Sequence, residues 1–130
     1  MAFNVLVVDD NRMMRSMVAR AVGMSGLSIS KTYEAGDGVQ ALKAMRSQWI
    51  DLVLLDINMP VMNGEEFLTQ LRADTALSKT LVIVVSTESS QPRITRLKEM
   101  GAGFIHKPFR PEELVNAVND LMAGKVGGDK

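Results

Sequence analysis

The chain has 130 residues, of which 15 are basic and 15 are acidic, and it contains no cysteine. This length suits a single core, the lack of cysteine excludes disulfides and thiol-ligated zinc, and zero net charge argues against direct nucleic-acid binding. No apolar stretch reaches the roughly 18 residues of a membrane span. No basic leader is visible, so we expect a cytoplasmic protein without membrane insertion. Residues 1–124 should form a single domain, and residues 125–130 a flexible C-terminal tail.

Short apolar runs alternate along the chain with longer segments of helical periodicity. This pattern is typical of βα units around a parallel sheet that is buried on both faces. The expected strands are 5–8, 28–34, 51–56, 81–86 and 103–106, and the segment 28–34 has the weakest pattern. After the first strand, apolar residues recur at helical spacing until Gly26: Met13, Met14, Met17, Val18, Ala21 and Val22. These methionines could form a surface for a partner, but we favour adaptable core packing.

The later helices carry start and stop signals. Asp37 is a candidate cap for the second helix, and Asn63 with Glu66 resembles a capping box for the third. The fourth helix should run from near Pro92 to Gly101, and the fifth should begin at Pro111. The predicted buried positions of these four helices are Val39, Leu42, Met45 and Trp49; Phe67, Leu68 and Leu71; Ile94 and Leu97; and Leu114, Val115, Val118, Leu121 and Met122.

Polar side chains follow four of the expected strands. Asp9 and Asp10 follow the first, Asp56 ends the third, Ser86 and Thr87 close the fourth, and Lys107 follows the fifth. A doubly wound sheet brings these strand ends to one edge, where ligands of such sheets bind. Three carboxylates at about 4–5 Å repel each other by roughly 1–4 kcal/mol per pair, which favours a bound cation. Oxygen ligands indicate Mg²⁺, with Mn²⁺ as a substitute.

In this arrangement Lys107 and Ser86 would face a phosphoryl anion, the first supplying charge and the second a hydrogen bond. Asp56 is then left as the nucleophile. His106 has a different interpretation: a phosphocarrier role is conceivable, but we expect an ordinary imidazole at the end of a strand.

Residues in four separated segments together resemble the receiver domain of two-component response regulators: the Asp9 and Asp10 pair, Asp56 followed by Met59, Pro60 and Gly64, then Ser86, and Lys107 before Pro108. The resemblance covers residues 3–122. It implies an α/β fold of the flavodoxin-like (βα)5 type, a three-layer sandwich around a five-stranded parallel sheet. It also implies a cis peptide bond between Lys107 and Pro108.

The resemblance implies roles for individual residues. Asp56 would accept the phosphoryl group, and Mg²⁺ would be held by Asp10, Asp56 and the backbone carbonyl of Asn58, with Asp9 acting through water. Lys107 would pair with the acyl phosphate. Ser86 and Thr87 would lie at the phosphate, and Phe104 would swing inward. Asn58 and Glu88 would tune the lifetime of the phosphorylated state.

The resemblance also implies partners. The phosphodonor would be a sensor histidine kinase, a phosphotransfer protein or a small phosphodonor, and a phosphatase could act on the product. The output target would bind the face formed by the fourth helix, fifth strand and fifth helix. Such a protein is a signalling switch rather than an enzyme, with only self-phosphorylation and autodephosphorylation expected. The chain resembles stand-alone chemotaxis receivers of the CheY type. It departs from the usual pattern at two positions: Thr87 stands where relatives usually carry Ala or Gly, and Phe104 stands where chemotaxis receivers often carry Tyr.

Several alternatives remain open at this stage. Within the receiver family, the chain could be a phosphorelay intermediate, a phosphate sink, or a receiver cut from a longer regulator. A magnesium phosphatase of the haloacid dehalogenase type needs a second acid two residues after its nucleophile, and Asn58 occupies that position. A flavin-binding module needs a phosphate-cradling loop after the first strand, where Asp9 and Asp10 would repel phosphate.

Overall fold

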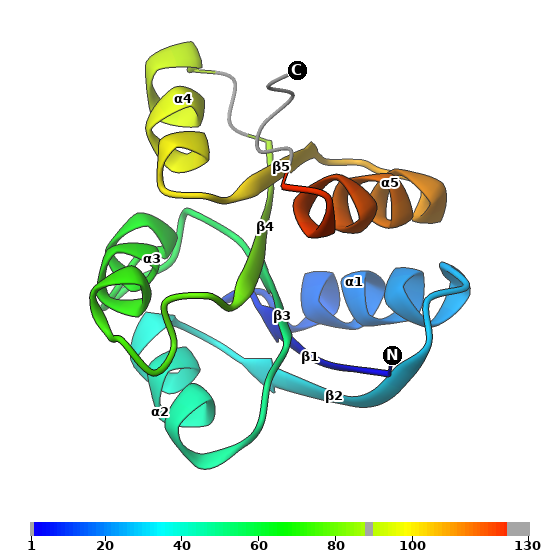
Figure 1. The fold of residues 1–130 in the computed structure, drawn as a ribbon, viewed down its shortest axis with the longest axis horizontal. Helices are drawn as coiled ribbons and strands as arrows, with labels where there is room; N and C mark the ends of the chain where they lie inside the picture. Colours follow the sequence, from blue (N-terminus) through cyan, green and yellow to red (C-terminus); the bar gives the residue numbers. More distant parts are fainter. Residues whose placement is uncertain (1, 88–89, 125–130) are drawn as a thin grey trace.

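The computed structural model describes residues 2–87 and 90–124, in which strands and helices alternate along the chain (Figure 1). In chain order these elements are β1 (Phe3–Val8), α1 (Arg12–Met24), β2 (Ile29–Ala35), α2 (Gly38–Ser47), β3 (Leu52–Leu55), α3 (Gly64–Ala73), β4 (Leu81–Ser86), α4 (Gln91–Glu99), β5 (Gly103–His106) and α5 (Pro111–Met122). No helix among these residues is long and apolar enough to cross a bilayer. The predicted tail, 125–130, lies outside the described residues.

The strands form one five-stranded parallel sheet in the order β2-β1-β3-β4-β5. Helices α1 and α5 cover one face, and α2, α3 and α4 cover the other (Figure 1). This arrangement confirms the predicted flavodoxin-like three-layer sandwich. The weakest expected strand is also present, displaced by one residue at each end to Ile29–Ala35. Because β1 and β3 pair in the middle of the sheet, the residues that follow them lie next to each other.

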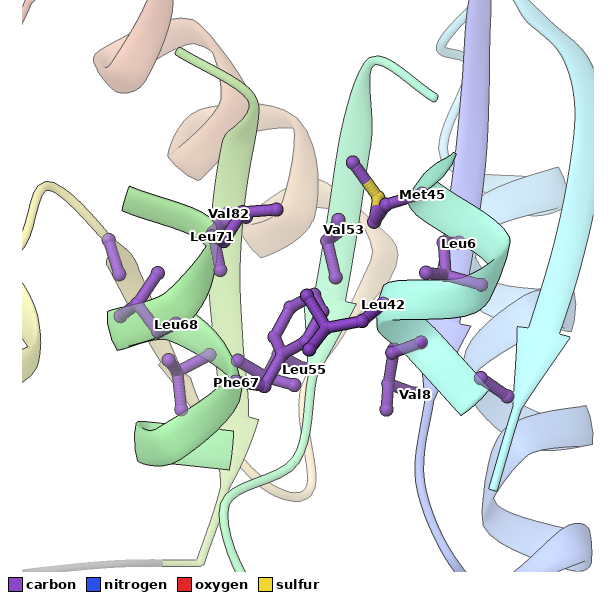
Figure 2. Close-up of a cluster of buried hydrophobic side chains, with 14 of the residues drawn as sticks. Leu6, Val8, Leu42, Met45, Val53, Leu55, Phe67, Leu68, Leu71 and Val82 are labelled. Atoms are coloured by element: carbon purple, nitrogen blue, oxygen red, sulfur yellow. The ribbon is translucent and has the colours of Figure 1, made fainter. Parts of the chain in front are cut away.

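Alternate residues of the central strands enter opposite halves of the core. In β1, Leu6 and Val8 face α2 and α3, whereas Val5 and Val7 face α1 and α5. Figure 2 shows the first half, where the fully buried ring of Phe67 lies among leucines and valines of the sheet and of α2. A slip of one residue would exchange the two faces. The packing of the two core faces therefore fixes the register of the strands, and with it the residues that lie at the carboxyl ends of the strands.

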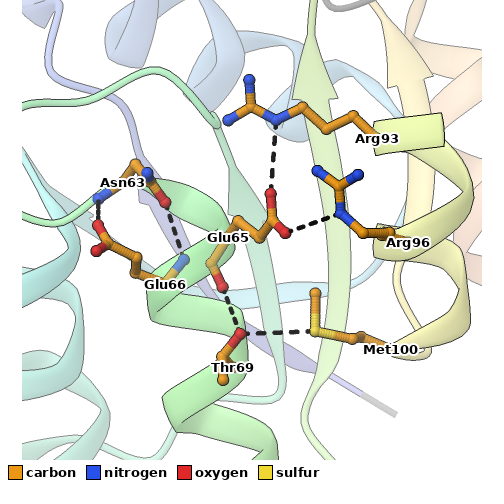
Figure 3. Close-up of polar contacts among 7 residues, drawn as sticks. All are labelled: Asn63, Glu65, Glu66, Thr69, Arg93, Arg96 and Met100. Carbon is orange, nitrogen blue, oxygen red and sulfur yellow. Dashed lines mark hydrogen bonds and ion pairs between the residues drawn. The ribbon is translucent and has the colours of Figure 1, made fainter. Parts of the chain in front are cut away.

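Local capping positions α3, the helix that follows the third strand. The Asn63 side chain accepts a hydrogen bond from the Glu66 N–H, and the Glu66 carboxylate accepts one from the Asn63 N–H, both at 2.9 Å. Figure 3 shows this box, which confirms the predicted one, beside Glu65, whose carboxylate is 3.6 Å from Arg93 and 3.2 Å from Arg96 of α4. The first turn of α3 is thus tied both to its own cap and to α4.

Several positions predicted to be buried are exposed. Met13 and Met17 are 72% and 58% exposed, and in α1 only Val18 and Val22 are fully buried. Met13 and Met17 lie outside the stripe that faces the sheet, so the interpretation of these two methionines as core packing was wrong. Trp49 is 79% exposed because α2 ends at Ser47 and its indole N–H donates to Asp51 instead. Other predicted core positions are also exposed or only half-buried: Val39 and Met122, and Met14, Ala21, Val115 and Leu121.

Candidate functional site

Three carboxylates meet at the carboxyl edge of the two central strands. Asp9 and Asp10 follow β1, and Asp56 follows β3, where its N–H donates to the carbonyl of Val8 at 2.9 Å. One carboxylate oxygen from each of the three residues lies within 4.8 Å of the others. Asp9 is buried, Asp56 is partly exposed and Asp10 is exposed. The cluster therefore opens to solvent on the side of Asp10.

The ammonium group of Lys107 lies against this cluster. Lys107 Nζ is 3.0 Å from Asp9 Oδ2 and 3.7 Å from Asp56 Oδ1, and its side chain is only 12% exposed. The Lys107 N–H donates to the carbonyl of Ser86 at 2.9 Å, and the bond to Pro108 is cis, as expected. One positive charge leaves the three carboxylates with an excess of negative charge. An all-oxygen donor set of this kind fits Mg²⁺.

The environment of Asp56 favours its neutral form. Burial raises the pKa of Asp56 above its ordinary value of 3.8; the Lys107 charge and a hydrogen bond from the Ile57 N–H lower it, while Asp9 and Asp10 raise it. The ammonium group therefore offsets only part of the cost of ionising a buried carboxylate. A bound cation would favour the ionised, nucleophilic form further.

Gly64 belongs to the motif, but its role could not be predicted from the motif alone. It is the first residue of α3, and its N–H donates to the carbonyl of Ile57 at 2.9 Å. A Cβ at this position would overlap the carbonyl oxygen of Asp56. Glycine is therefore required for the close approach of the helix to the backbone that carries Asp56. A glycine at the start of a capped helix is the signal that could have indicated this contact.

The structure describes four of the remaining predicted site residues, and none of the four belongs to the acidic cluster. Ser86 is fully buried at the end of β4, next to His106 in the strand ladder, and Thr87 is exposed. Phe104 is half-buried, with its ring centroid 4.8 Å from that of His106 in an edge-on contact. Asn58 is exposed. Glu88, predicted to tune the lifetime of the phosphorylated state, lies outside the described residues.

A cavity of about 330 Å³ opens next to the cluster, between α1 and the segment after β5. Lys107 and Thr87 form its polar side. Its other walls are largely apolar: Met14, Met17, Val18, Ala21, Pro108 and Phe109. An approach to the carboxylates is thus bordered by a surface that can bind an apolar partner.

Residues 5–119 match the family of response regulator receiver domains. The chain belongs to this family. Among curated relatives, the receiver domain is 34% identical over 122 residues to the nitrate/nitrite response regulator protein NarL of Escherichia coli K12, and 30% identical to the probable transcriptional regulator ycf29 of Pyropia yezoensis. These alignments cover 94% and 97% of this chain but 56% of each relative, so the chain spans about half their length.

Solved structures of receivers superpose well on this receiver domain. The chemotaxis protein CheY4 of Vibrio cholerae has a TM-score of 0.79 at 32% identity, covering 93% of this chain and 99% of CheY4. The receiver domain of the Francisella response regulator 1452 has a TM-score of 0.78 at 28% identity, covering 94% and 98%. Receiver domains are signalling switches of two-component systems, generally not true enzymes. We therefore set aside the phosphatase and flavin alternatives.

Proposed function

We propose that this receiver is switched by phosphorylation of Asp56. The donor would be the phosphohistidine of a sensor histidine kinase or a phosphotransfer protein, or a small phosphodonor. The observation that carries the proposal is the meeting of Asp56 with two further carboxylates and the ammonium of Lys107 at one sheet edge. The apolar cavity beside Lys107 supports a protein as the natural donor.

In the transfer, an oxygen of ionised Asp56 attacks phosphorus and forms the new O–P bond. The P–N bond to the donor histidine breaks, its electron pair stays on the imidazole nitrogen, and an acyl phosphate is left on Asp56. The ammonium group of Lys107 balances negative charge on the phosphoryl oxygens. Its distance of 3.7 Å from Asp56 supports this role.

The residues that would hold Mg²⁺ are Asp10, Asp56 and the backbone carbonyl of Asn58, with Asp9 acting through water. When bound, Mg²⁺ would offset the charge of the carboxylates and of the incoming phosphoryl group. Asp9 suits an indirect role because its two oxygens already accept hydrogen bonds, from the Asn11 N–H at 2.9 Å and from Lys107. Mn²⁺ could replace Mg²⁺.

The response would begin at Ser86 and Thr87, which would hydrogen-bond the phosphoryl oxygens, and continue to Phe104, which would move inward. The half-buried ring of Phe104 supports such a movement because it is not enclosed by the core. The downstream protein would bind the face formed by α4, β5 and α5. Asn58 and Glu88 would set the lifetime of the signal, with or without a phosphatase.

Intact mass measurement after incubation with acetyl phosphate and Mg²⁺ tests the proposal. We expect a gain of about 80 Da, the mass of one phosphoryl group, that is labile to hydroxylamine. It should be absent without Mg²⁺ and absent in Asp56→Asn, which keeps the shape of the side chain. A wild-type protein that gains no mass from acetyl phosphate or from a phosphorylated histidine kinase would disprove the proposal.

Two outputs are compatible with this chemistry. The match to 99% of CheY4 supports a CheY-like chemotaxis receiver that binds its target when phosphorylated, whereas NarL and ycf29 support a receiver that controls an attached output domain. A reading frame that continues past Lys130 would favour the second. A relay intermediate or phosphate sink would instead return its phosphoryl group when mixed with an unphosphorylated kinase or phosphotransfer protein.

A further inference from the structure

Arg15 of α1 makes contacts that join the ends of two strands beside the acidic cluster. Its Nη1 donates to the backbone carbonyl of Asp9 at 2.7 Å, and its Nε donates to Glu34 Oε1 of β2 at 3.0 Å. The Arg15 side chain is 18% exposed and that of Glu34 is 45% exposed, so the contact with the Asp9 carbonyl is the better shielded from solvent of the two. No signal in the sequence indicated this residue, because its partners are 6 and 19 positions away.

The carbonyl that Arg15 binds belongs to the peptide group that joins Asp9 to Asp10. On the other side of Asp9, its N–H donates to the carbonyl of Ala35 at 3.1 Å. The backbone at the carboxyl end of β1 is therefore held from both sides. The direction in which the Asp10 side chain leaves this backbone depends on the orientation of that peptide group.

Asp10 depends on its backbone more than the other two acids do. The carboxylate of Asp9 accepts hydrogen bonds from Asn11 and Lys107, and that of Asp56 lies near Lys107. The exposed carboxylate of Asp10 has no hydrogen bond or ion pair with any residue in 2–87 or 90–124. Asp10 is therefore the carboxylate of the cluster whose position depends most on the backbone that carries it.

Glu34 balances the charge of the Arg15 guanidinium, so that this group does not compete with a metal ion for the carboxylates of the cluster. Its carboxylate pairs with Arg15 and balances the positive charge. The planar guanidinium is thereby oriented so that a different nitrogen points to the Asp9 carbonyl. The pair contributes a directed hydrogen bond with little net charge.

We propose that Arg15 is a positioning residue for the divalent cation, acting through the Asp9 carbonyl to place the carboxylate of Asp10. The inference rests on the proposed function, since it assumes that Asp10 ligates Mg²⁺. Groups that orient metal ligands from outside the coordination shell typically contribute about 10–100-fold to metal affinity. Arg15 reaches Asp10 through the backbone only, so the effect should lie near the lower limit.

Titration calorimetry with MgCl₂, without phosphodonor, tests the inference on wild type and Arg15→Gln. We expect Arg15→Gln to weaken Mg²⁺ binding by about tenfold. The matched control is Arg20→Gln, since Arg20 is exposed on the same helix and has no ion pair or side-chain hydrogen bond in the part of the chain that the structure describes. Its affinity should stay at the wild-type value. Arg15→Lys should be intermediate, because one ammonium cannot reach both partners.

The rate of mass gain from acetyl phosphate, measured against Mg²⁺ concentration, separates positioning from general support of the fold. In Arg15→Gln the Mg²⁺ concentration for half-maximal rate should rise about tenfold, while the rate at saturating Mg²⁺ returns to that of wild type. An unchanged half-maximal concentration, with or without a lower maximal rate, would overturn the inference. If Arg15→Gln is unfolded at the assay temperature, the same criterion applies to Arg15→Lys and to Glu34→Gln.

The proposed function can fail independently of this inference. A wild-type protein that neither binds Mg²⁺ nor gains mass would overturn both. A wild type that binds Mg²⁺ and is phosphorylated, together with an Arg15→Gln variant of equal Mg²⁺ affinity, would overturn only the role of Arg15.

Discussion

The contact between Gly64 and the backbone at Asp56 predicts that one added methyl group should disturb the site. In Gly64→Ala the new Cβ would overlap the Asp56 carbonyl oxygen and lie 2.9 Å from Ile57 Cα and 3.1 Å from the Asp56 carbonyl carbon. These are backbone atoms, so no side-chain rotation can relieve the overlap. The start of α3 or the segment after β3 must move.

The loss of stability can be estimated from two effects. Overpacking of a close contact costs about 1–3 kcal/mol, and the Gly64 N–H to Ile57 carbonyl bond, if lost, adds about 1 kcal/mol. A sum of about 2–4 kcal/mol is below the typical stability of about 5–15 kcal/mol. The variant should fold, with a Tm lower by roughly 10 °C. Its phosphorylation by acetyl phosphate should also slow, because the atoms displaced belong to Asp56.

Gly23→Ala is the matched control. Gly23 lies near the end of α1, and its Cβ would meet no heavy atom within 4 Å. Alanine should therefore stabilise the helix there by about 0.5–1 kcal/mol. Urea unfolding followed by circular dichroism compares the two variants with wild type. The steric argument is refuted if Gly64→Ala is as stable as wild type, or if both substitutions change stability with the same sign.

Three further predictions concern stability in the presence of a chelator. Burial raises the pKa of Asp56, so the folded protein loses stability as the pH rises from 3.8, the ordinary pKa of this group, through its raised pKa. Asp56→Asn should therefore have a higher Tm than wild type at pH 7 and lose that advantage near pH 3. Val61 is 81% exposed and has a φ of 67°, a backbone conformation that strains a β-branched residue. Val61→Asn should therefore raise the free energy of unfolding by about 1 kcal/mol, measured by urea unfolding, and equal urea midpoints would exclude backbone strain at this position. Arg72 donates to the carbonyls of Thr80 and Met100 at 2.7 Å each, so Arg72→Met should lower the free energy of unfolding by about 1–3 kcal/mol, and an unchanged value would show that water replaces the guanidinium.

Much of the fold could be predicted because its signals are local. The capping box of Asn63 and Glu66 needs only four consecutive residues, and the apolar runs of the central strands are buried on both faces whatever their neighbours. Burial on helices was harder to predict. Met13 and Trp49 are as apolar as core residues, but the end of α2 at Ser47 and the orientation of α1 leave them exposed. Neither feature is encoded in the spacing of apolar residues.

The candidate site divides in the same way. The meeting of Asp9, Asp10 and Asp56 could be predicted from strand ends and right-handed crossovers alone. The contact of Arg15 with Glu34 could not, because it requires the register of β2 against β1. The reactive groups are therefore encoded in local patterns, whereas the residues that orient them depend on long-range hydrogen bonds.

The strand order places the acidic cluster and the β5 edge in surroundings that constrain substitutions to different degrees. Asp9 and Asp56 follow β1 and β3, strands with neighbours on both sides, whereas Phe104 belongs to β5, which among the described strands pairs with β4 alone. Substitutions near the acids must satisfy two adjoining strands and two layers of helices at once. Substitutions along the outer side of β5 meet fewer such demands, so relatives could acquire new binding partners there while the chemistry at the centre stays unchanged.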